Sequence, residues 1–231
     1  MALSDDLHSR VATIFRDQWT ENNKTVVAEP KDIQLGNHAG YYESATVLYA
    51  DLSGSTAMVD NYTWHFSAEV YKTYLACAAT IIKAESGVIT AYDGDRVMAV
   101  FLGDSKNTLA VRAAMKINYA VIEIINPALK NQYPNDNFIV GHSIGIDTSP
   151  LRAARIGVRN DNDLVWVGRA ANYAAKLAAE DGDYLLITED VFNVCNEEVK
   201  NHQGNSMWQK KHWTTMNNMA VYNSNWLYRI D

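Results

Sequence analysis

Residues 45–59 read ATVLYADLSGSTAMV, and this stretch combines the features that decide the fold. Residues 46–49 are a run of β-branched, aliphatic and aromatic side chains, the composition of a buried strand. Asp51 follows, and a small-residue turn then leads into a helical pattern: Ser53, Gly54, Ser55 and Thr56. A strand-end carboxylate before a helix N-terminus suits a metal ion carrying a phosphate, because backbone N–H groups there face the anion. Ordinary helix capping gives the same pattern, so both interpretations stay open here.

The second informative segment, residues 87–102, reads GVITAYDGDRVMAVFL. Two β-rich runs flank the Asp-Gly dipeptide at 93–94, which predicts a hairpin, and Asp95 follows the turn. If this hairpin pairs beside the first strand, Asp95 and Asp51 converge at one sheet edge. Together with the carbonyl of Leu52 they can hold two divalent ions for a phosphoryl transfer. An Asp in a tight turn can also serve the turn alone, but the pairing of two carboxylates favours a metal site.

The third segment, residues 168–180, reads GRAANYAAKLAAE and predicts an alanine-rich helix. Asn172 and Lys176 are four positions apart, so both project from one helix face. An amide there can orient a sugar oxygen, and a cation can stabilise the charge that develops on a reacting phosphorus. The alternative is a polar stripe that faces solvent.

The rest of the chain predicts helices interleaved with strands, which indicates an α/β sandwich, most simply a ferredoxin-like core with additions. The predicted helices cover residues 4–19, 55–84, 106–129 and 189–194. The predicted strands cover 45–51, 138–147, 151–157, 164–167 and 185–188, with a turn at Ser149 and Pro150, a polar arm over 21–43 and a strand-like tail from Trp208.

The composition is that of an ordinary globular protein, with 231 residues, 48% hydrophobic and 20% charged. A net charge of −7 gives no reason to expect nucleic acid or a membrane surface as a partner. The chain has no apolar run as long as a membrane span, and its N-terminus lacks a signal-peptide pattern. We therefore expect a cytoplasmic protein.

The three segments together resemble the class III nucleotide cyclases, the family of the adenylyl and guanylyl cyclases. ADLSGST at 50–56 is similar to the family's metal-binding strand and phosphate turn. YDGDRVMAVF at 92–101 is similar to its hairpin, and VWVGRAANYAAKL at 165–177 to its Asn-x-x-x-Arg helix. The resemblance covers residues 45–190, with all three motifs in the family's order.

This resemblance implies a ferredoxin-like catalytic core over residues 45–190, preceded by an N-terminal helix and arm over 1–44. A C-terminal extension over 191–231 is expected to pack on the core. In the family, two subunits associate head to tail, and each active site takes its metal carboxylates from one subunit and its Asn/Arg helix from the other. The resemblance therefore implies a homodimer with two sites at the interface.

The resemblance also implies a role for each motif residue. Asp51, Asp95 and the carbonyl of Leu52 are expected to bind two Mn²⁺ or Mg²⁺ ions, and the turn at 53–56 to hold the phosphates of a nucleoside triphosphate. The catalytic helix residues are Asn172, which positions the ribose, and Lys176, which stands where the family usually has Arg. Lys brings the same charge without the planar fork. The implied reaction is attack of the ribose 3′-OH on the α-phosphate, with pyrophosphate leaving.

The positions that read the base depart from the purine-specific members of the family. Those members place a Lys and an Asp where this chain has Ala91 and Val165, and neither of these side chains can form a hydrogen bond. ATP is therefore not the expected substrate, since polar complementarity supplies most discrimination between similar ligands. Tyr49 lies on the strand face of Asp51 and could contact a small base, unless it is a core aromatic. Further candidates are Tyr92, Trp166 and Arg169.

These departures resemble the pyrimidine cyclases of bacterial antiphage signalling, the Pycsar systems. The resemblance implies conversion of UTP to cyclic UMP, a diffusible messenger that activates a separate effector. Three alternatives remain open: a cytidylate cyclase, a purine cyclase with an atypical base pocket, and an inactive cyclase-like domain that binds a nucleotide as a sensor.

Overall fold

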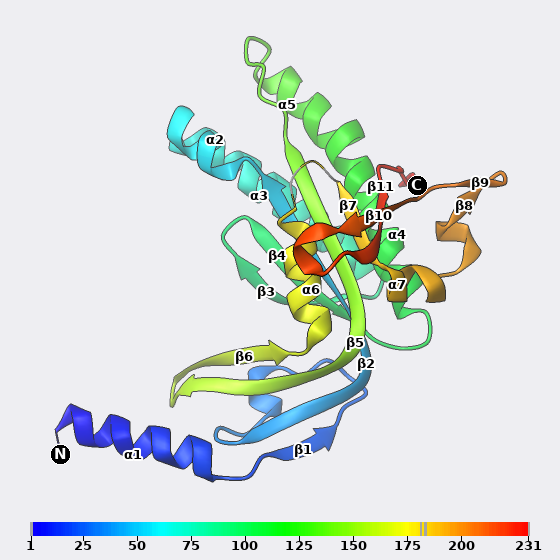
Figure 1. Ribbon diagram of the computed structural model, residues 1–231. Coiled ribbons are helices and arrows are strands. Elements are labelled where there is room, and N and C mark those ends of the chain that lie inside the picture. The colour runs from blue at the N-terminus through cyan, green and yellow to red at the C-terminus, as the bar shows by residue number, and fades with distance from the viewer. Residues whose placement is uncertain (1, 181, 183, 231) are drawn as a thin grey trace.

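The computed structural model describes residues 2–180, 182 and 184–230, which form an α/β domain around one large sheet (Figure 1). The strands of this sheet are β1 (Thr20–Asn23), β2 (His38–Ser53), β3 (Val88–Asp93), β4 (Arg96–Phe101), β5 (Gly141–Val158), β6 (Asp161–Val167), β7 (Leu185–Thr188), β10 (Gln209–Trp213) and β11 (Met219–Ser224). The helices are α1 (Leu3–Arg16), α2 (Ser55–Asn61), α3 (Trp64–Ala84), α4 (Lys106–Tyr119), α5 (Asn126–Gln132), α6 (Arg169–Ala178) and α7 (Glu189–Val194). A π-helical segment, Ala120–Ile125, joins α4 to α5, and β8 (Asn201–His202) and β9 (Asn205–Ser206) form a separate hairpin.

The two longest strands, β2 and β5, form the centre of the sheet. The order is β10-β11-β7-β5-β2-β4-β3, with β1 added to β2 and β6 added to β5. β5 and β7 are parallel, as are β1 and β2, and the other pairs are antiparallel. The hairpin of β3 and β4 therefore lies beside β2, as the sequence predicts.

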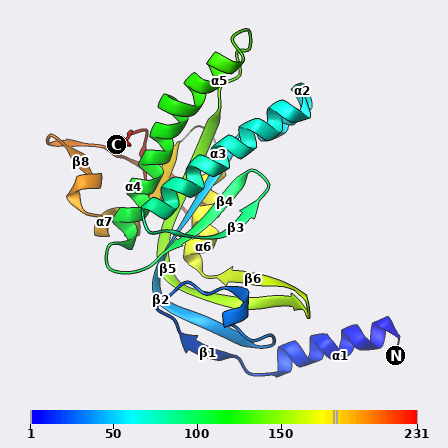
Figure 2. The same cartoon turned by 180° about the vertical axis from the view of Figure 1, so that it is seen from behind.

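The side chains of β2 alternate between two differently covered faces. Leu48 and Ala50 are buried in a core that they share with α3 and α4, which lie in front of the sheet in Figure 2. Val47 is buried on the opposite face against the alanines of α6, which lies in front of the sheet in Figure 1. Tyr49 and Asp51 have the parity of Val47, so they lie on the α6 face of the sheet.

The predicted turn at Ser149 and Pro150 is wrong, because β5 continues through both residues. The register between β2 and β5 shifts at this point, from Tyr42 opposite Leu151 to Ala45 opposite Ser149. Pro150 has no partner within this irregularity, so the missing N–H costs no hydrogen bond of the ladder. A bulge in the partner strand thus accommodates a proline that reads locally as a turn.

The segment predicted as a polar arm, residues 21–43, contains regular structure instead. It holds most of β1, the 3-10 turn Pro30–Asp32 and the first part of β2. These elements pair with each other and with the second half of β5, which carries β6, so they extend the sheet below the core (Figure 1). Helix α1 follows the predicted position and has no buried residue. Arg10 donates a hydrogen bond to the carbonyl of Gly157 in β5, and Asn37 of the arm donates one to the carbonyl of Ile14.

The C-terminal tail adds two strands to the other side of the sheet. β11 pairs with β7, and β10 pairs with β11. Trp208 and Trp213 are buried there. In the part of the chain that the structure describes, no helix combines the length and the apolar composition that crossing a bilayer requires.

Gly145 permits the close approach of α6 to the sheet. A Cβ atom at this position would lie 2.1 Å from the carbonyl oxygen of Ala174 and 2.5 Å from the backbone nitrogen of Ala178. We expect Gly145→Ala to lower the free energy of unfolding by roughly 2 kcal/mol or more, because α6 has to move away from the sheet. Denaturant unfolding measures the loss. The matched control on the same strand is Gly141→Ala, whose Cβ would meet only the Ser53 side chain, at 3.3 Å, and a loss as large there would contradict this explanation.

Candidate active site

Asp51 lies near the end of β2 with its side chain 18% exposed. Its backbone carbonyl accepts a hydrogen bond from the buried Tyr74 hydroxyl at 3.2 Å, which fixes the end of the strand. Burial raises the pKa of the Asp51 carboxyl, Arg96 opposes that rise, and the carboxylates of Asp95 and Asp93 add to it. The carboxyl group is therefore partly buried among other charges, as is common at functional sites.

The hairpin brings Asp95 to the same end of the sheet. β4 pairs with β2 so that Arg96 lies directly opposite Asp51, and Asp95 immediately precedes Arg96. Asp95 is partly exposed, and its charge acts on the pKa of Asp51. The structure thus brings together the two carboxylates that the sequence predicts as metal ligands.

This arrangement fits a hard divalent cation. Asp51 Oδ1 is buried, and no hydrogen-bond partner for it occurs among the described residues. The side chain of Leu52 is buried in the core on the other face, so only its backbone is available to the site. Across the described ranges no cluster of three or more His, Cys, Asp or Glu side chains could hold a metal. The available donors are therefore two carboxylates and backbone oxygen, which Mg²⁺ and Mn²⁺ accept.

The predicted phosphate turn follows Asp51 directly. β2 ends at Ser53, Gly54 adopts a left-handed conformation with φ of 73°, and α2 begins at Ser55. A left-handed residue is what glycine permits at low cost, so the chain can reverse into the helix here. Ser53, Gly54 and Thr56 are exposed, and the first N–H groups of α2 have no acceptor within the helix.

Asn172 and Lys176 lie on the exposed face of α6, whose other face packs alanines on the sheet. Among the hydrogen bonds and ion pairs of the described residues, none connects either side chain to Asp51 or Asp95. A cavity of about 440 Å³ adjoins Asp51 and the phosphate turn, and it is also lined by the last residue of α6, Ala178, and by residues 179–180 that follow the helix. Within the described residues, Asn172 and Lys176 are therefore not bonded to the carboxylates of their own chain.

Tyr49 and Ala91 lie in one row across the sheet, since both pair with Met98 of β4. Tyr49 is half-buried, and burial raises the pKa of its hydroxyl, while Arg96 lowers it and Asp93 raises it further. Ala91 is exposed, and so is its neighbour Tyr92. This part of the predicted base pocket therefore adjoins the carboxylates.

The other candidates for the base pocket lie elsewhere in the chain. Trp166 is buried, with its ring 5.8 Å from that of Tyr42, and Val165 lies beside it on β6. Arg169 is engaged in ion pairs with Asp147 and Asp190 and donates to the carbonyl of Thr148 at 2.8 Å. The position of Trp166 agrees with a core aromatic, and the Nε and Nη2 donors of Arg169 are taken up by Asp147, Thr148 and Asp190.

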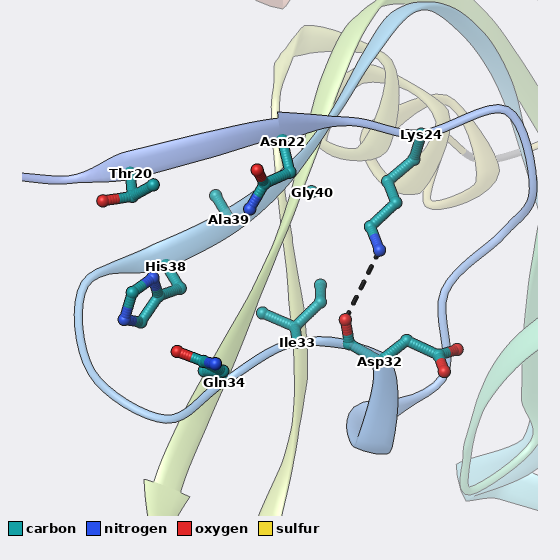
Figure 3. Close-up of a pocket in the computed structure, with 9 residues that line it drawn as sticks. All are labelled: Thr20, Asn22, Lys24, Asp32, Ile33, Gln34, His38, Ala39 and Gly40. Carbon is teal, nitrogen blue, oxygen red and sulfur yellow. Dashed lines mark hydrogen bonds between the residues drawn. The ribbon is translucent and has the colours of Figure 1, made fainter.

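A further cavity, of about 320 Å³, lies in the arm between β1 and the start of β2 (Figure 3). Lys24 crosses it and donates to the carbonyl of Asp32 at 3.4 Å. None of its lining residues belongs to the three sequence motifs. It is therefore separate from the candidate active site.

Sequence reasoning did not single out Arg96 or Tyr74, which both contact Asp51. The signal for Arg96 is its place directly after Asp95, because a predicted register for the hairpin would put it opposite Asp51. Tyr74 carries no such signal, since it reads as one of several apolar positions on a long helix.

Solved structures of known proteins resemble the fold of this chain. The chain is similar to the adenylyl cyclase CyaB from P. aeruginosa, with 18% identity and a TM-score of 0.64 over 80% of this chain and 95% of that one. The fold is therefore that of the class III nucleotidyl cyclases, as the sequence predicts.

Two full-length relatives are much closer in sequence. The uridylate cyclase of Burkholderia cepacia is 52% identical over 231 residues, and that of Xanthomonas perforans is 53% identical over 232 residues. Each alignment covers 100% of both chains. No family model matches the sequence. The chain belongs to the uridylate cyclase family of nucleotidyl cyclases.

Proposed function

We propose that this protein converts UTP into 3′,5′-cyclic UMP and pyrophosphate. The observation that carries the proposal is the identity above 50%, over the full length of both chains, with two proteins named uridylate cyclase. The convergence of Asp51 and Asp95 beside an exposed phosphate turn supports the same chemistry.

The carboxylates of Asp51 and Asp95, with the carbonyl of Leu52, would hold two Mg²⁺ or Mn²⁺ ions. When bound, such ions supply Lewis acidity at the α-phosphate and favour deprotonation of the attacking hydroxyl. The backbone of the turn at residues 53–56 binds and orients the phosphate oxygens through its N–H groups. The 3′-oxygen then forms a bond to the α-phosphorus as the bond to pyrophosphate breaks.

The second half of each site comes from a partner copy of the chain. Asn172 positions the ribose, and Lys176 places a positive charge near the reacting phosphorus. Support for a homodimer comes from the positions of these side chains, which are exposed on α6 and form no hydrogen bond or ion pair, within the described residues, with the carboxylates of their own chain.

The base pocket is proposed to suit a pyrimidine. Tyr49 and Ala91 lie on either side of Met98 in the sheet. The hydroxyl of Tyr49 is proposed to contact the pyrimidine ring of the substrate there. Ala91 and Val165 lack the polar groups that a purine edge requires. The cyclic UMP formed is proposed to act as a diffusible messenger for an effector in antiphage defence, as the resemblance to Pycsar cyclases implies.

The test is to incubate the protein separately with UTP, CTP, ATP and GTP in the presence of Mn²⁺ and to identify the products by mass spectrometry. We expect cyclic UMP to form fastest, at roughly tenfold the rate of any other product or more. Cyclic CMP as the main product would contradict UTP as the substrate and would indicate a cytidylate cyclase. A purine product would contradict the pyrimidine pocket, and no product from any nucleotide, at concentrations where dimers form, would favour a silent nucleotide-binding domain.

A further inference from the structure

Arg96 lies between two carboxylates in one row across the sheet. The register places Asp51 of β2 opposite Arg96 on one side and Asp93 of β3 opposite it on the other. Directly opposite residues of antiparallel strands share a face of the sheet, so the three side chains project together. The guanidinium of Arg96 thus stands between Asp51, which is proposed to bind the cations, and Asp93.

The contact between Arg96 and Asp51 is loose. Arg96 Nη2 lies 3.7 Å from Asp51 Oδ2, beyond the range of a charge-assisted hydrogen bond. Arg96 Nε and Asp51 Oδ1 are both buried, and neither has a hydrogen-bond partner in the described part of the chain. Elsewhere the protein builds tight pairs, such as Arg112 Nε to Glu85 at 2.7 Å. Arg96 and Asp51 therefore attract each other electrostatically without a hydrogen bond, and Asp51 Oδ1 remains without a partner among the described residues.

We propose that Arg96 is a counter-ion built into the metal site, and that it competes with the divalent cation for Asp51. The proposal rests on the proposed function, because it takes Asp51 as a metal ligand. Without nucleotide, the guanidinium of Arg96 neutralises part of the negative charge of Asp51 and its neighbouring carboxylates, and it repels an arriving cation. Cation binding is therefore weak until the phosphates of the nucleotide add negative charge, and metal and nucleotide bind together.

Two features let the guanidinium leave Asp51 when a cation arrives. The Arg96 side chain is 38% exposed, so it can turn without leaving a buried charge unpaired. Asp93 lies directly opposite it on the other side and offers a second carboxylate. Asp93 is itself exposed, at the tip of the hairpin. The guanidinium of Arg96 can thus pair with either Asp51 or Asp93. Only the pair with Asp51 competes with a metal ion for its proposed ligand.

The experiment measures Mn²⁺ binding to the nucleotide-free full-length protein by electron paramagnetic resonance. We expect Arg96→Gln to bind Mn²⁺ about tenfold more tightly than the unaltered protein, because a positive charge near the cation is gone. Arg96→Lys is the matched control and should bind as weakly as the unaltered protein. Asp93→Asn should weaken binding, since the guanidinium then has only Asp51. Addition of 3′-deoxy-UTP, which lacks the attacking hydroxyl, should reduce the difference between Arg96→Gln and the unaltered protein.

Equal or weaker Mn²⁺ binding by Arg96→Gln would overturn the proposal, and so would the absence of measurable binding in that variant. Tighter binding by Arg96→Lys would also overturn it, because the charge is retained there. The measurements without nucleotide use no turnover, so they are independent of which nucleotide is the substrate. The double variant Asp51→Asn, Arg96→Gln separates the proposed role of Arg96 from the assignment of Asp51 as a metal ligand. Loss of Mn²⁺ binding there supports Asp51 as the ligand, and retained binding refutes the metal assignment itself.

Discussion

Asp51→Asn and Asp95→Asn are each expected to lower the rate of cyclic nucleotide formation by a factor on the order of a thousand or more. Each change keeps the shape of the side chain and removes the charge that would hold the cations. Asp51 and Asp95 are both only partly buried, so the fold should persist. The measurements are turnover of UTP with Mn²⁺ and the melting temperature of each variant.

The matched control is Asp104→Asn, which removes an exposed carboxylate beyond the other end of β4. It should change turnover by less than about twofold, because a surface charge far from the reacting atoms is largely screened by salt. Retained activity in Asp51→Asn or Asp95→Asn, with the protein folded, would refute the assignment of these residues as metal ligands.

Mixing two inactive variants is expected to restore activity if the sites lie between two chains. Asp51→Asn damages the carboxylate half of a site, and Asn172→Ala damages the helix half. A heterodimer of the two has one site with both halves intact and one with both damaged. Random pairing makes half of the dimers mixed, so about one quarter of the full activity should return. Turnover after mixing and equilibration measures this value.

A second mixture serves as the control. Asp51→Asn and Asp95→Asn damage the same half, so no pairing of these two chains contains an intact site, and no activity should return. Mixed dimers can be detected with a differently tagged copy of each variant. Mixed dimers of Asp51→Asn and Asn172→Ala without activity would show that each site lies within one chain.

The parts of the site that the sequence predicts are those with a local signal. Asp51 follows a run of strand composition, and an Asp-Gly dipeptide between β-rich segments indicates the hairpin that carries Asp95. Asn172 and Lys176 share a helix face because of their spacing alone. The structure agrees with each of these local features, since it places β2, the β3–β4 hairpin and α6 where the patterns predict them.

The structural features that could not be predicted from the sequence depend on pairing with strands that are distant along the chain. β5 passes through Pro150 only because β2 has an irregularity opposite it, a hundred or so residues earlier in the chain. The polar residues 20–23 and 38–44 form strands because β2 and β5 are there to pair with them. Hydrophobic periodicity contains no information on either pairing, since both depend on register between strands and not on composition.

The same distinction separates the candidate residues. By itself the sequence determined the type of chemistry, because a strand-end carboxylate, a hairpin carboxylate and a polar helix face are each defined by neighbours along the chain. Only the tertiary structure decided what each charge contacts. It places Arg169 against Asp147, which is fully buried, and it places Arg96 against Asp51. Charge pairs of this kind are set by strand register and helix packing, which join residues that the sequence keeps apart.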